Sequence, residues 1–421
     1  MLNINTDVIV IGGGSAGCFA AICAANTGAK TLLVEKNGML GGTTTTGRVN
    51  FPGLFHAWGK QIIDGPCWES IERCVQRGGA TLPPFPYKSE HHNMQQILLD
   101  VFTYACVLDD MCEEAGVDVL LHSMVADVTE ERDGVRVTLA TKNGMRAVDA
   151  KVLIDATGDA DALRIAGCEY EVSEQLQPAT LIHDLGGYDP EAIDADTLRA
   201  YLAAVYESGE LTLEDSQGRD IAKMVKKGRI HMHIDAPEAH TSEGKTALEI
   251  KARRRLAKIL SCLSKFEGLE DIRAARFASE CGVRETVRIV GEHRISADEY
   301  LSGEVTEDSV CYAFYPIDLH QSTGIYQIFV KEDTVPTVSY GALVPKGKTR
   351  MLCAGRCICS DTNANSALRV QATCMATGQV AGVAAAICAS DGSALANVSM
   401  DKLKASLRAI GAIVPGDISF K

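Results

Sequence analysis

The sequence predicts an α/β fold: a nucleotide-binding domain around a parallel sheet, and a second, α+β domain beside it. Three stretches carry this prediction. Residues 7–36 have the pattern strand, glycine-rich turn, small-residue helix and second strand; residues 117–161 alternate apolar and polar residues between turns; residues 357–388 lead into a long helix of small residues. Short apolar runs that alternate with helices are typical of parallel strands covered on both faces. With 421 residues the chain exceeds the size of about 250–300 residues at which single cores stop growing.

The first apolar run leads directly into a glycine-rich turn. Gly12, Gly14 and Gly17 have the spacing G-x-G-x-x-G. In such a turn the first glycine permits the tight bend, the second lets the backbone approach a pyrophosphate, and the third lets the helix pack against the strand. Ser15 and Ala16 open the helix, whose N-terminus offers unpaired amides to phosphate groups. The turn therefore predicts a dinucleotide site, with a purely structural glycine turn as the alternative.

The second strand supports the same site. It ends in Glu35, at the distance from Gly17 at which an acidic residue binds the ribose of a dinucleotide. Lys36 follows directly and joins the predicted cofactor-binding set. The strand and its carboxylate complete the context that a lone glycine motif lacks.

A threonine-rich loop follows the second strand. Gly41, Gly42 and Thr43 make it flexible and polar enough to wrap a pyrophosphate, and Arg48 supplies a positive charge; a solvated surface loop is the alternative. His56 comes shortly afterwards and is a candidate proton carrier, although a lone histidine is more often structural.

The middle of the chain contains a predicted meander. Asp133-Gly134 and Asn143-Gly144 separate alternating segments, which is a strong hairpin signal. A return strand then leads to the string IDATGDAD. This order predicts three antiparallel strands that join the parallel sheet.

The turn GGGSAG, the acidic strand end, the paired glycines of the loop, the meander and IDATGDAD together resemble the FAD-binding domain of the glutathione-reductase-type flavoproteins. More narrowly, the chain resembles the FAD-dependent oxidoreductase family related to fumarate reductase and tRNA-modifying flavoproteins. The resemblance implies that Thr157 and Gly158 lie close to an FAD, with Asp159 beside its pyrophosphate. It also implies that backbone near Val125 and Ala126 meets the adenine. The threonine-rich loop has no histidine or cysteine that could form a covalent link, so the FAD is expected to be non-covalent.

The C-terminal part resembles the closing element of the same family. A strand ends at Gly355, and a polar loop leads into the long helix. By this resemblance Asp361 meets the ribityl chain, while Asn365 and Ser366 lie at a helix start that faces the flavin pyrimidine, where the helix dipole stabilises negative charge. The string DTNANS stands where the family often has a histidine, so no catalytic histidine is expected at this position.

Two motifs in the second domain are the catalytic candidates. GVRETVRIVGEH contains Arg284, and YPIDLH contains Asp318 and His320; both strings resemble substrate-domain signatures of the family. An arginine there orients or polarises an oxygen-rich substrate, and His320 is the general acid or base, with Asp318 or His56 in support. The alternative is an interdomain network of ion pairs.

Composition excludes some classes of partner. The net charge of −14 and pI near 5.2 argue against nucleic acid, and so against the tRNA-modifying alternative. No signal peptide or membrane span is expected, which favours a cytoplasmic location. The 15 cysteines are expected to be buried thiols, and no metal site is expected. Cys353, Cys357 and Cys359 lack the spacing of a zinc or iron–sulfur site, and a redox disulfide there stays open.

The predicted FAD domain comprises residues 1–60, 95–167 and 336–421, and the substrate or cap domain comprises 61–94 and 168–335. One dinucleotide motif implies a separate electron acceptor or donor. The expected reaction is hydride transfer between flavin N5 and an oxygen-bearing small molecule, such as a sugar, hydroxy acid or carboxylate. A non-catalytic FAD-binding redox protein is the remaining alternative, and homo-oligomerisation is open.

Overall fold

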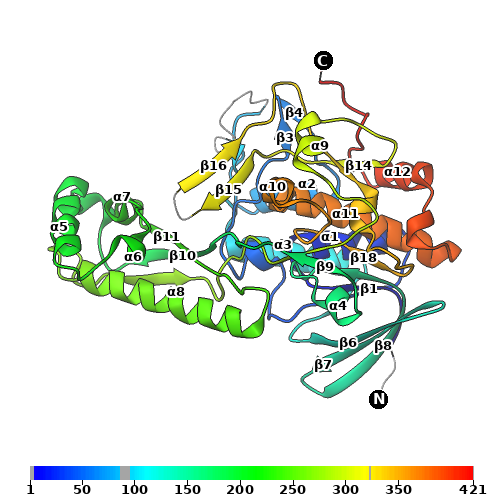
Figure 1. Cartoon of the computed structure of the whole chain (residues 1–421), viewed down its shortest axis with the longest axis horizontal. Helices are drawn as coiled ribbons and strands as arrows, with labels where there is room; N and C mark the ends of the chain where they lie inside the picture. The colour runs from blue at the N-terminus through cyan, green and yellow to red at the C-terminus, as the bar shows by residue number, and fades with distance from the viewer. Residues whose placement is uncertain (1–3, 86–94, 322–323, 421) are drawn as a thin grey trace.

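The computed structural model describes residues 4–85, 95–321 and 324–420 and divides into a large domain and a smaller cap (Figure 1). The large domain is built on parallel strands in the order β5-β2-β1-β8, with β18 paired to β8 on its other side. Their sequences are apolar, and Val8, Ile9 and Val10 at the centre of β1 are fully buried. These strands are β1 (Ile4–Ile11), β2 (Thr31–Val34), β5 (Asp118–Leu120), β8 (Gly144–Asp155) and β18 (Met351–Cys353).

Helices of small residues pack against this sheet. The closest pair is α1 (Ser15–Asn26) and α11 (Gln371–Asp391), because a Cβ at Gly378 or Gly382 would lie 2.2 Å from a backbone oxygen of α1. By length and composition α11 could cross a membrane, but here its apolar window is completely buried inside the protein, as in the core helix of a globule. Helices α3 (Val101–Glu114) and α4 (Asp161–Ile165) also contact strands of this sheet, whereas α2 (Pro66–Gln76) and α12 (Met400–Ala409) pack against α11.

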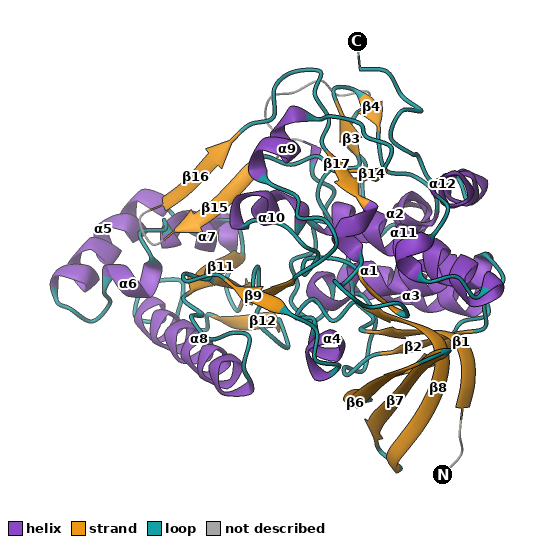
Figure 2. Ribbon diagram, turned by 45° about the vertical axis from the view of Figure 1, so that its right-hand side comes forward, coloured by secondary structure: helices purple, strands orange, loops and turns teal. Residues whose placement is uncertain are grey.

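The predicted meander is confirmed. Strands β6 (Met124–Glu131) and β7 (Gly134–Thr141) pair antiparallel with each other, and β7 pairs with β8. Both hairpins turn through two residues, at the two Asx-Gly strings that the sequence indicated. Figure 2 shows the meander fanning out from the parallel strands at the edge of the molecule.

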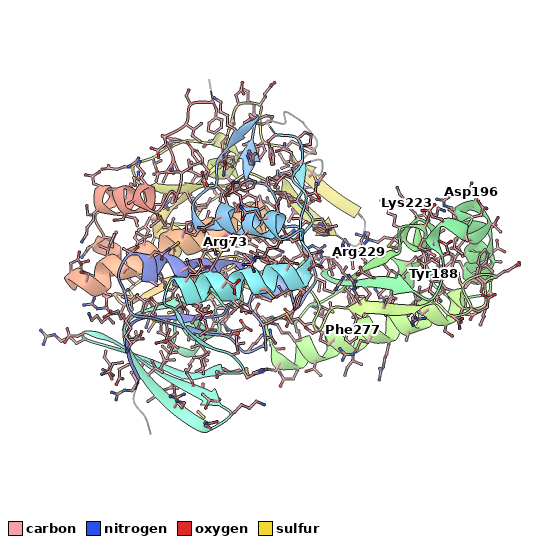
Figure 3. All side chains as sticks on the ribbon, turned by 180° about the vertical axis from the view of Figure 1, so that it is seen from behind. Arg73, Tyr188, Asp196, Lys223, Arg229 and Phe277 are labelled. Carbon is pink, nitrogen blue, oxygen red and sulfur yellow. The ribbon has the colours of Figure 1, made fainter. Side chains whose placement is uncertain are left out.

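The cap has its own sheet and core. Its antiparallel strands lie in the order β11-β10-β12, with α5, α6 and α7 at the end away from the large domain and α8 running along the strands back toward it (Figure 1). Figure 3 places Arg229 where the cap meets the large domain and Asp196 at the far end of the cap. The elements are β10 (Ala179–Gly186), α5 (Ala195–Glu207), α6 (Leu213–Ser216), α7 (Ile221–Lys226), β11 (Arg229–Ile234), α8 (Ser242–Leu263) and β12 (Arg273–Phe277).

The two hydrophobic cores divide the chain at places that differ from the predicted boundaries. The cap core contains buried residues from Ala179 to Cys281, whereas α2 and residues 287–335 pack into the core of the large domain. Their apolar side chains, such as Trp68 and Tyr300, find burial against the helices and loops of that domain rather than on the cap. The part of the predicted cap segment at 86–94 lies outside the described residues.

Short elements complete the large domain. They are β3 (His56–Ala57), β4 (Lys60–Gln61), β9 (Tyr170–Val172), β13 (Val287–Ile289), α9 (Ala297–Ser302), β14 (Ser309–Tyr312), β15 (Ile317–Gln321), β16 (Gly324–Ile328), β17 (Thr337–Ser339) and α10 (Thr362–Leu368).

Candidate active site between the large domain and the cap

A cavity of about 730 Å³ lies between the large domain and the cap. One end is at the carboxyl ends of β1 and β2, where open α/β sheets bind their ligands. The other end is formed by the cap strands β10 and β11 and by the start of α11. Twelve of the predicted cofactor-binding residues line it: Gly12, Gly14, Ser15, Ala16, Glu35, Lys36, Gly42, Thr43, Thr157, Gly158, Asp159 and Gly355.

The glycine turn has the expected geometry. Gly12 has φ +100°, and a Cβ on it would lie 2.6 Å from the Ala156 oxygen. A Cβ on Gly17 would lie 1.7 Å from the Gly12 oxygen, so this glycine serves the contact of helix with strand, outside the cavity lining. A Cβ on Gly14 would meet only the Gly42 Cα, at 3.9 Å. Gly14 caps α1 without a side-chain hydrogen bond, so the amides of Ser15 and Ala16 are left for a ligand.

Glu35 connects the turn to the end of β2. Its Oε2 accepts a hydrogen bond from the Gly13 amide at 2.7 Å, and its Oε1 accepts one from the Asn37 amide at 2.8 Å. The residue lines the cavity and is only 5% exposed. An open glycine cradle, a free helix N-terminus and a buried carboxylate after the second strand fit the phosphate and ribose groups of a dinucleotide such as FAD.

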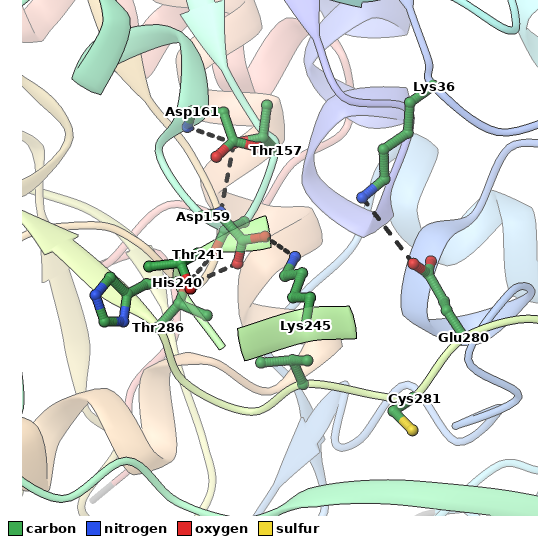
Figure 4. A network of polar contacts seen from close by, with 12 residues as sticks. Lys36, Thr157, Asp159, Asp161, His240, Thr241, Lys245, Glu280, Cys281 and Thr286 are labelled. Carbon is green, nitrogen blue, oxygen red and sulfur yellow. Dashed lines mark hydrogen bonds and ion pairs between the residues drawn. The ribbon is translucent and has the colours of Figure 1, made fainter. Parts of the chain in front are cut away.

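Asp159 is the centre of a charged network on the same side of the cavity (Figure 4). It accepts hydrogen bonds from Arg356 Nη2 at 2.5 Å and Thr286 Oγ1 at 2.8 Å, and it contacts Lys245 of the cap helix α8. Burial opposes ionisation, but Arg356 and Lys245 outweigh it and hold the pKa of Asp159 below its ordinary value. Lys36 lies 4.0 Å from Glu280, which also comes from the cap side.

The helix that starts at the cavity is α11 rather than α10. Asp361 caps α10, and its carboxylate accepts from the amides of Ala364 and Ala297. Asn365 donates to the Arg356 oxygen, and the Ser366 hydroxyl accepts from the Asp318 amide. These three predicted residues therefore form hydrogen bonds within the protein around α10, and they do not line the cavity.

The start of α11 takes the place that the sequence analysis assigned to residues 365–366. Val370, Gln371 and Cys374 line the cavity, and α11 has no side-chain N-cap. Gln371 accepts from Thr44 Oγ1 at 2.6 Å and donates to the Val49 oxygen at 2.7 Å, which fixes the helix start against the threonine-rich loop.

Four other predicted cofactor residues lie outside the cavity lining. Arg48 forms an ion pair with Asp184 of the cap at 2.6 Å, so it joins the two domains. Gly41 has φ +99° and permits the bend of the loop. Val125 and Ala126 lie on β6, at the start of the meander.

His56 lies in an aromatic cluster and also outside the cavity lining. Its ring stacks on Phe85 with centroids 3.7 Å apart and meets the edge of Trp68 at 5.2 Å. Burial lowers the pKa of His56 to about 4. Its surroundings are those of a neutral core histidine.

Arg284 and His320 both line the cap end of the cavity, as two of the three catalytic candidates. His320 Nε2 donates to Asp318 Oδ2 at 2.9 Å, and its Nδ1 is buried without a hydrogen-bond partner. Burial lowers the pKa of His320, Asp318 raises it, and nearby Arg284 lowers it; the net shift is downward. The ring is thus neutral near pH 7, with a free nitrogen that accepts a proton.

Residues that the sequence analysis did not single out complete this end. His233 Nε2 accepts from Arg219 at 2.7 Å and from Arg284 at 3.0 Å, and its ring lies 4.8 Å from that of His320. Arg369 lies 3.9 Å from Asp318. Burial, with Arg369 and Arg219 nearby, lowers the pKa of Arg284 to about 9. The alternation Arg229, His231, His233 along β11 was the available signal, because every second residue of a strand faces the same side.

Glu285, beside Arg284 in the same string, and the cysteines lie outside the catalytic set. Glu285 pairs with Arg288 at 2.6 Å in the core of the large domain. All fifteen cysteines are free, and the sulfurs of Cys353 and Cys357 lie 3.3 Å apart in a fully buried position. Among the described residues, no group of histidine, cysteine or acidic side chains is arranged to hold a metal ion.

A family model described as FAD dependent oxidoreductase matches residues 7–407. Digeranylgeranylglycerophospholipid reductase 1 of Methanosphaera stadtmanae is 29% identical over 162 residues, which are 37% of this chain and 38% of the relative. A ribosomal RNA dihydrouridine synthase of Escherichia coli is 29% identical over 181 residues, 40% of this chain and 44% of the relative. A fumarate reductase (cytochrome) of Shewanella frigidimarina is 40% identical over 81 residues, which are 18% of this chain and 13% of the relative.

The chain thus spans less than half the length of these three relatives. Among solved structures, a geranylgeranyl bacteriochlorophyll reductase-like protein of Thermoplasma acidophilum is 15% identical and aligns over 97% of this chain and 83% of that chain, with a TM-score of 0.47. The family model covers nearly the whole sequence, and its description agrees with the predicted resemblance. The chain therefore belongs to the FAD-dependent oxidoreductase family.

Proposed function

We propose that this oxidoreductase transfers a hydride between its FAD and a small substrate that carries a carboxylate. The observation that carries the proposal is the charge at the cap end of the cavity. Its described lining residues include one carboxylate, Asp318, and five cations: Arg219, Lys227, Arg229, Arg284 and Arg369. At the other end, by contrast, four carboxylates accompany three cations: Glu35, Asp159, Glu249 and Glu280 with Lys36, Lys245 and Arg356.

An excess of partly buried arginines is unfavourable unless an anion accompanies them. Removing a charge from water costs several kcal/mol if no partner compensates it. The guanidinium group is planar and forked, and it binds a carboxylate through two parallel hydrogen bonds. Arg369 Nε is buried without a hydrogen-bond partner, and so is the hydroxyl of Thr180 on the facing strand β10. These donors and the cationic arginines support an anionic ligand.

His320 is the proton carrier in this proposal. Its hydrogen bond to Asp318 fixes the proton on Nε2 and leaves Nδ1 as the acceptor. When the substrate is oxidised, Nδ1 takes the proton of the reacting hydroxyl; in the reverse direction it returns the proton. Asp318 stabilises the charged ring that forms. Bound FAD supplies the site that accepts or releases the hydride.

The other end of the cavity is proposed to hold the cofactor. The amides of Ser15 and Ala16 bind the diphosphate, and Glu35 binds the adenosine ribose. The start of α11, at Gln371, also lines the cavity, and its helix dipole would stabilise negative charge on a reduced flavin bound beside it. This arrangement leaves the cap end, with Arg284, for the substrate.

Anaerobic bleaching of the flavin tests the proposal. The holoenzyme is mixed with hydroxy acids, dicarboxylates and neutral sugars, and absorbance of the oxidised flavin is followed. We expect bleaching by a carboxylate compound and at least about 100-fold weaker bleaching by its uncharged amide, the loss that follows when charged hydrogen bonds are left unmade. Arg284→Gln should remove this preference, whereas the control Arg294→Gln, on an exposed ion pair with Glu171, should not. Bleaching by neutral sugars as strong as that by the carboxylate compounds would contradict the proposal that the substrate carries a carboxylate.

A further inference from the structure

Lys245 occupies an electrostatically unfavourable position in its own helix. It lies in the first turn of α8, behind the N-cap Thr241. The positive end of the helix dipole disfavours a cation there. Its ammonium group reaches out of the cap and contacts Asp159 of the large domain (Figure 4). A partner outside the helix is therefore needed to hold it.

The contact with Asp159 does not satisfy the Lys245 ammonium group completely. The carboxylate already accepts from Arg356 and Thr286, so two cations share one buried anion. The Lys245 side chain is 33% exposed, whereas that of Asp159 is 4% exposed. Asp159 takes one of the three donors of the Lys245 ammonium group, which also lines the cavity and is partly exposed.

This ammonium group lines the same cavity as the predicted phosphate site. Lys245 lines the cavity together with Gly14, Ser15 and Ala16 at the free N-terminus of α1. Lys36 also lines the cavity, and it is held by Glu280 only at 4.0 Å. The helix N-terminus alone supplies about half a positive charge, which is less than the charge of a diphosphate.

We propose that Lys245 is a ligand for the cofactor diphosphate contributed by the cap, so that binding of FAD fastens α8 to the large domain. An ammonium group between a carboxylate and a phosphate satisfies both, because it has three donors. The proposal rests on the placement of the diphosphate at α1 and is independent of the substrate.

The test uses the full-length chain stripped of flavin and the variant Lys245→Met, which keeps the apolar stem and removes the charge. Lys251→Met is the control, because Lys251 lies on the same helix but faces Glu214 and Asp235 within the cap, at 3.8 and 4.0 Å. Dissociation constants are measured for FAD, ADP and adenosine, the last two by competition with FAD. We expect Lys245→Met to weaken FAD and ADP by about 10- to 100-fold, the effect of one charged hydrogen bond, and to leave adenosine unchanged.

Unchanged affinity for ADP, or an equal loss for ADP and adenosine, would overturn the proposal. Amide hydrogen exchange of the unmodified chain gives a second test that needs no variant. ADP should slow exchange in the first turns of α8, and exchange that ADP does not alter there would also overturn it. Gly14→Val reports separately on whether the diphosphate lies at α1, so failure of that placement is distinguished from failure of the role of Lys245.

Discussion

Substitutions of Gly14 are expected to affect cofactor binding without affecting folding. Its backbone has φ −82° and ψ −165°, which any residue adopts without strain. A Cβ there would meet only the Gly42 Cα, at the ordinary contact distance of 3.9 Å. Gly14→Ala and Gly14→Val are therefore expected to fold, with the new methyl groups placed in the cavity between the two glycine backbones.

The magnitudes follow from this geometry. Replacing a glycine in a permitted conformation stabilises a protein by about 0.4–1 kcal/mol, because the unfolded chain loses freedom. Apoprotein melting should change little in Gly14→Ala, because the preference of the N-cap of α1 for glycine over alanine offsets this gain. FAD affinity, measured by quenching of flavin fluorescence, should fall at least about 100-fold in Gly14→Val, because the backbone can no longer approach the diphosphate.

Gly17→Ala is the comparison variant, because it should affect folding and not only cofactor binding. Its Cβ would lie 1.7 Å from the Gly12 oxygen, so this variant should lose stability and not merely affinity. A Gly14→Val protein that binds FAD as tightly as the unmodified chain would refute the placement of the cofactor at the start of α1.

Three further outcomes are expected. Glu35→Ala should weaken FAD about 10- to 150-fold in the same fluorescence assay, since a charged acceptor for the ribose is lost; unchanged affinity would mean that Glu35 only holds the turn. His320→Ala should slow flavin reduction by the bleaching compound about 10²- to 10⁴-fold in stopped-flow measurements without releasing FAD, and full speed would remove its role as proton carrier. Burial lowers the pKa of His56 from 6.5 to about 4, so the unfolded chain binds its proton first and stability falls as pH drops from about 6.5 to 4. His56→Phe should lessen this fall in melting temperature, and an unchanged pH profile would contradict the assigned shift.

The nucleotide end of the site was predictable because its requirements are local. Gly12 provides the positive φ of the tight turn, Gly17 is needed for a contact within the same strand–turn–helix unit, and Glu35 follows at the end of the next strand. The meander was equally predictable, since two-residue Asx-Gly turns determine their own hairpins. In these cases a stretch of a few tens of residues contains the signals that determine the local structure.

The loop before α11 could not be placed in this way. Asp361 has the composition of a ligand for a hydroxyl-rich chain, but the same carboxylate caps a helix equally well, and here it caps α10. The helix start at the cavity lies nine residues further on, at Val370, which has no capping side chain and therefore no local signal.

The arrangement at the cap end of the cavity could not be predicted from the sequence, because it depends on how the cap docks against the large domain. Arg219 and His233 are separated from Arg284 by many residues and meet it only because β11 turns one face to the cavity. Alternation predicts which residues share a face but not which face the large domain covers.

The central claim is that the cap end of the cavity binds a carboxylate beside the flavin, and the most direct measurement is perturbation of the flavin absorbance spectrum by unreactive ligands. Acetate, oxalate and succinate are titrated into the oxidised holoenzyme at constant ionic strength, with glycerol as the neutral probe. The account predicts a saturable shift of the spectrum by at least one carboxylate, none by glycerol, and loss of the shift in Arg284→Gln but not in Arg294→Gln. No shift with any carboxylate, or equal shifts in Arg284→Gln and the unmodified protein, would contradict it.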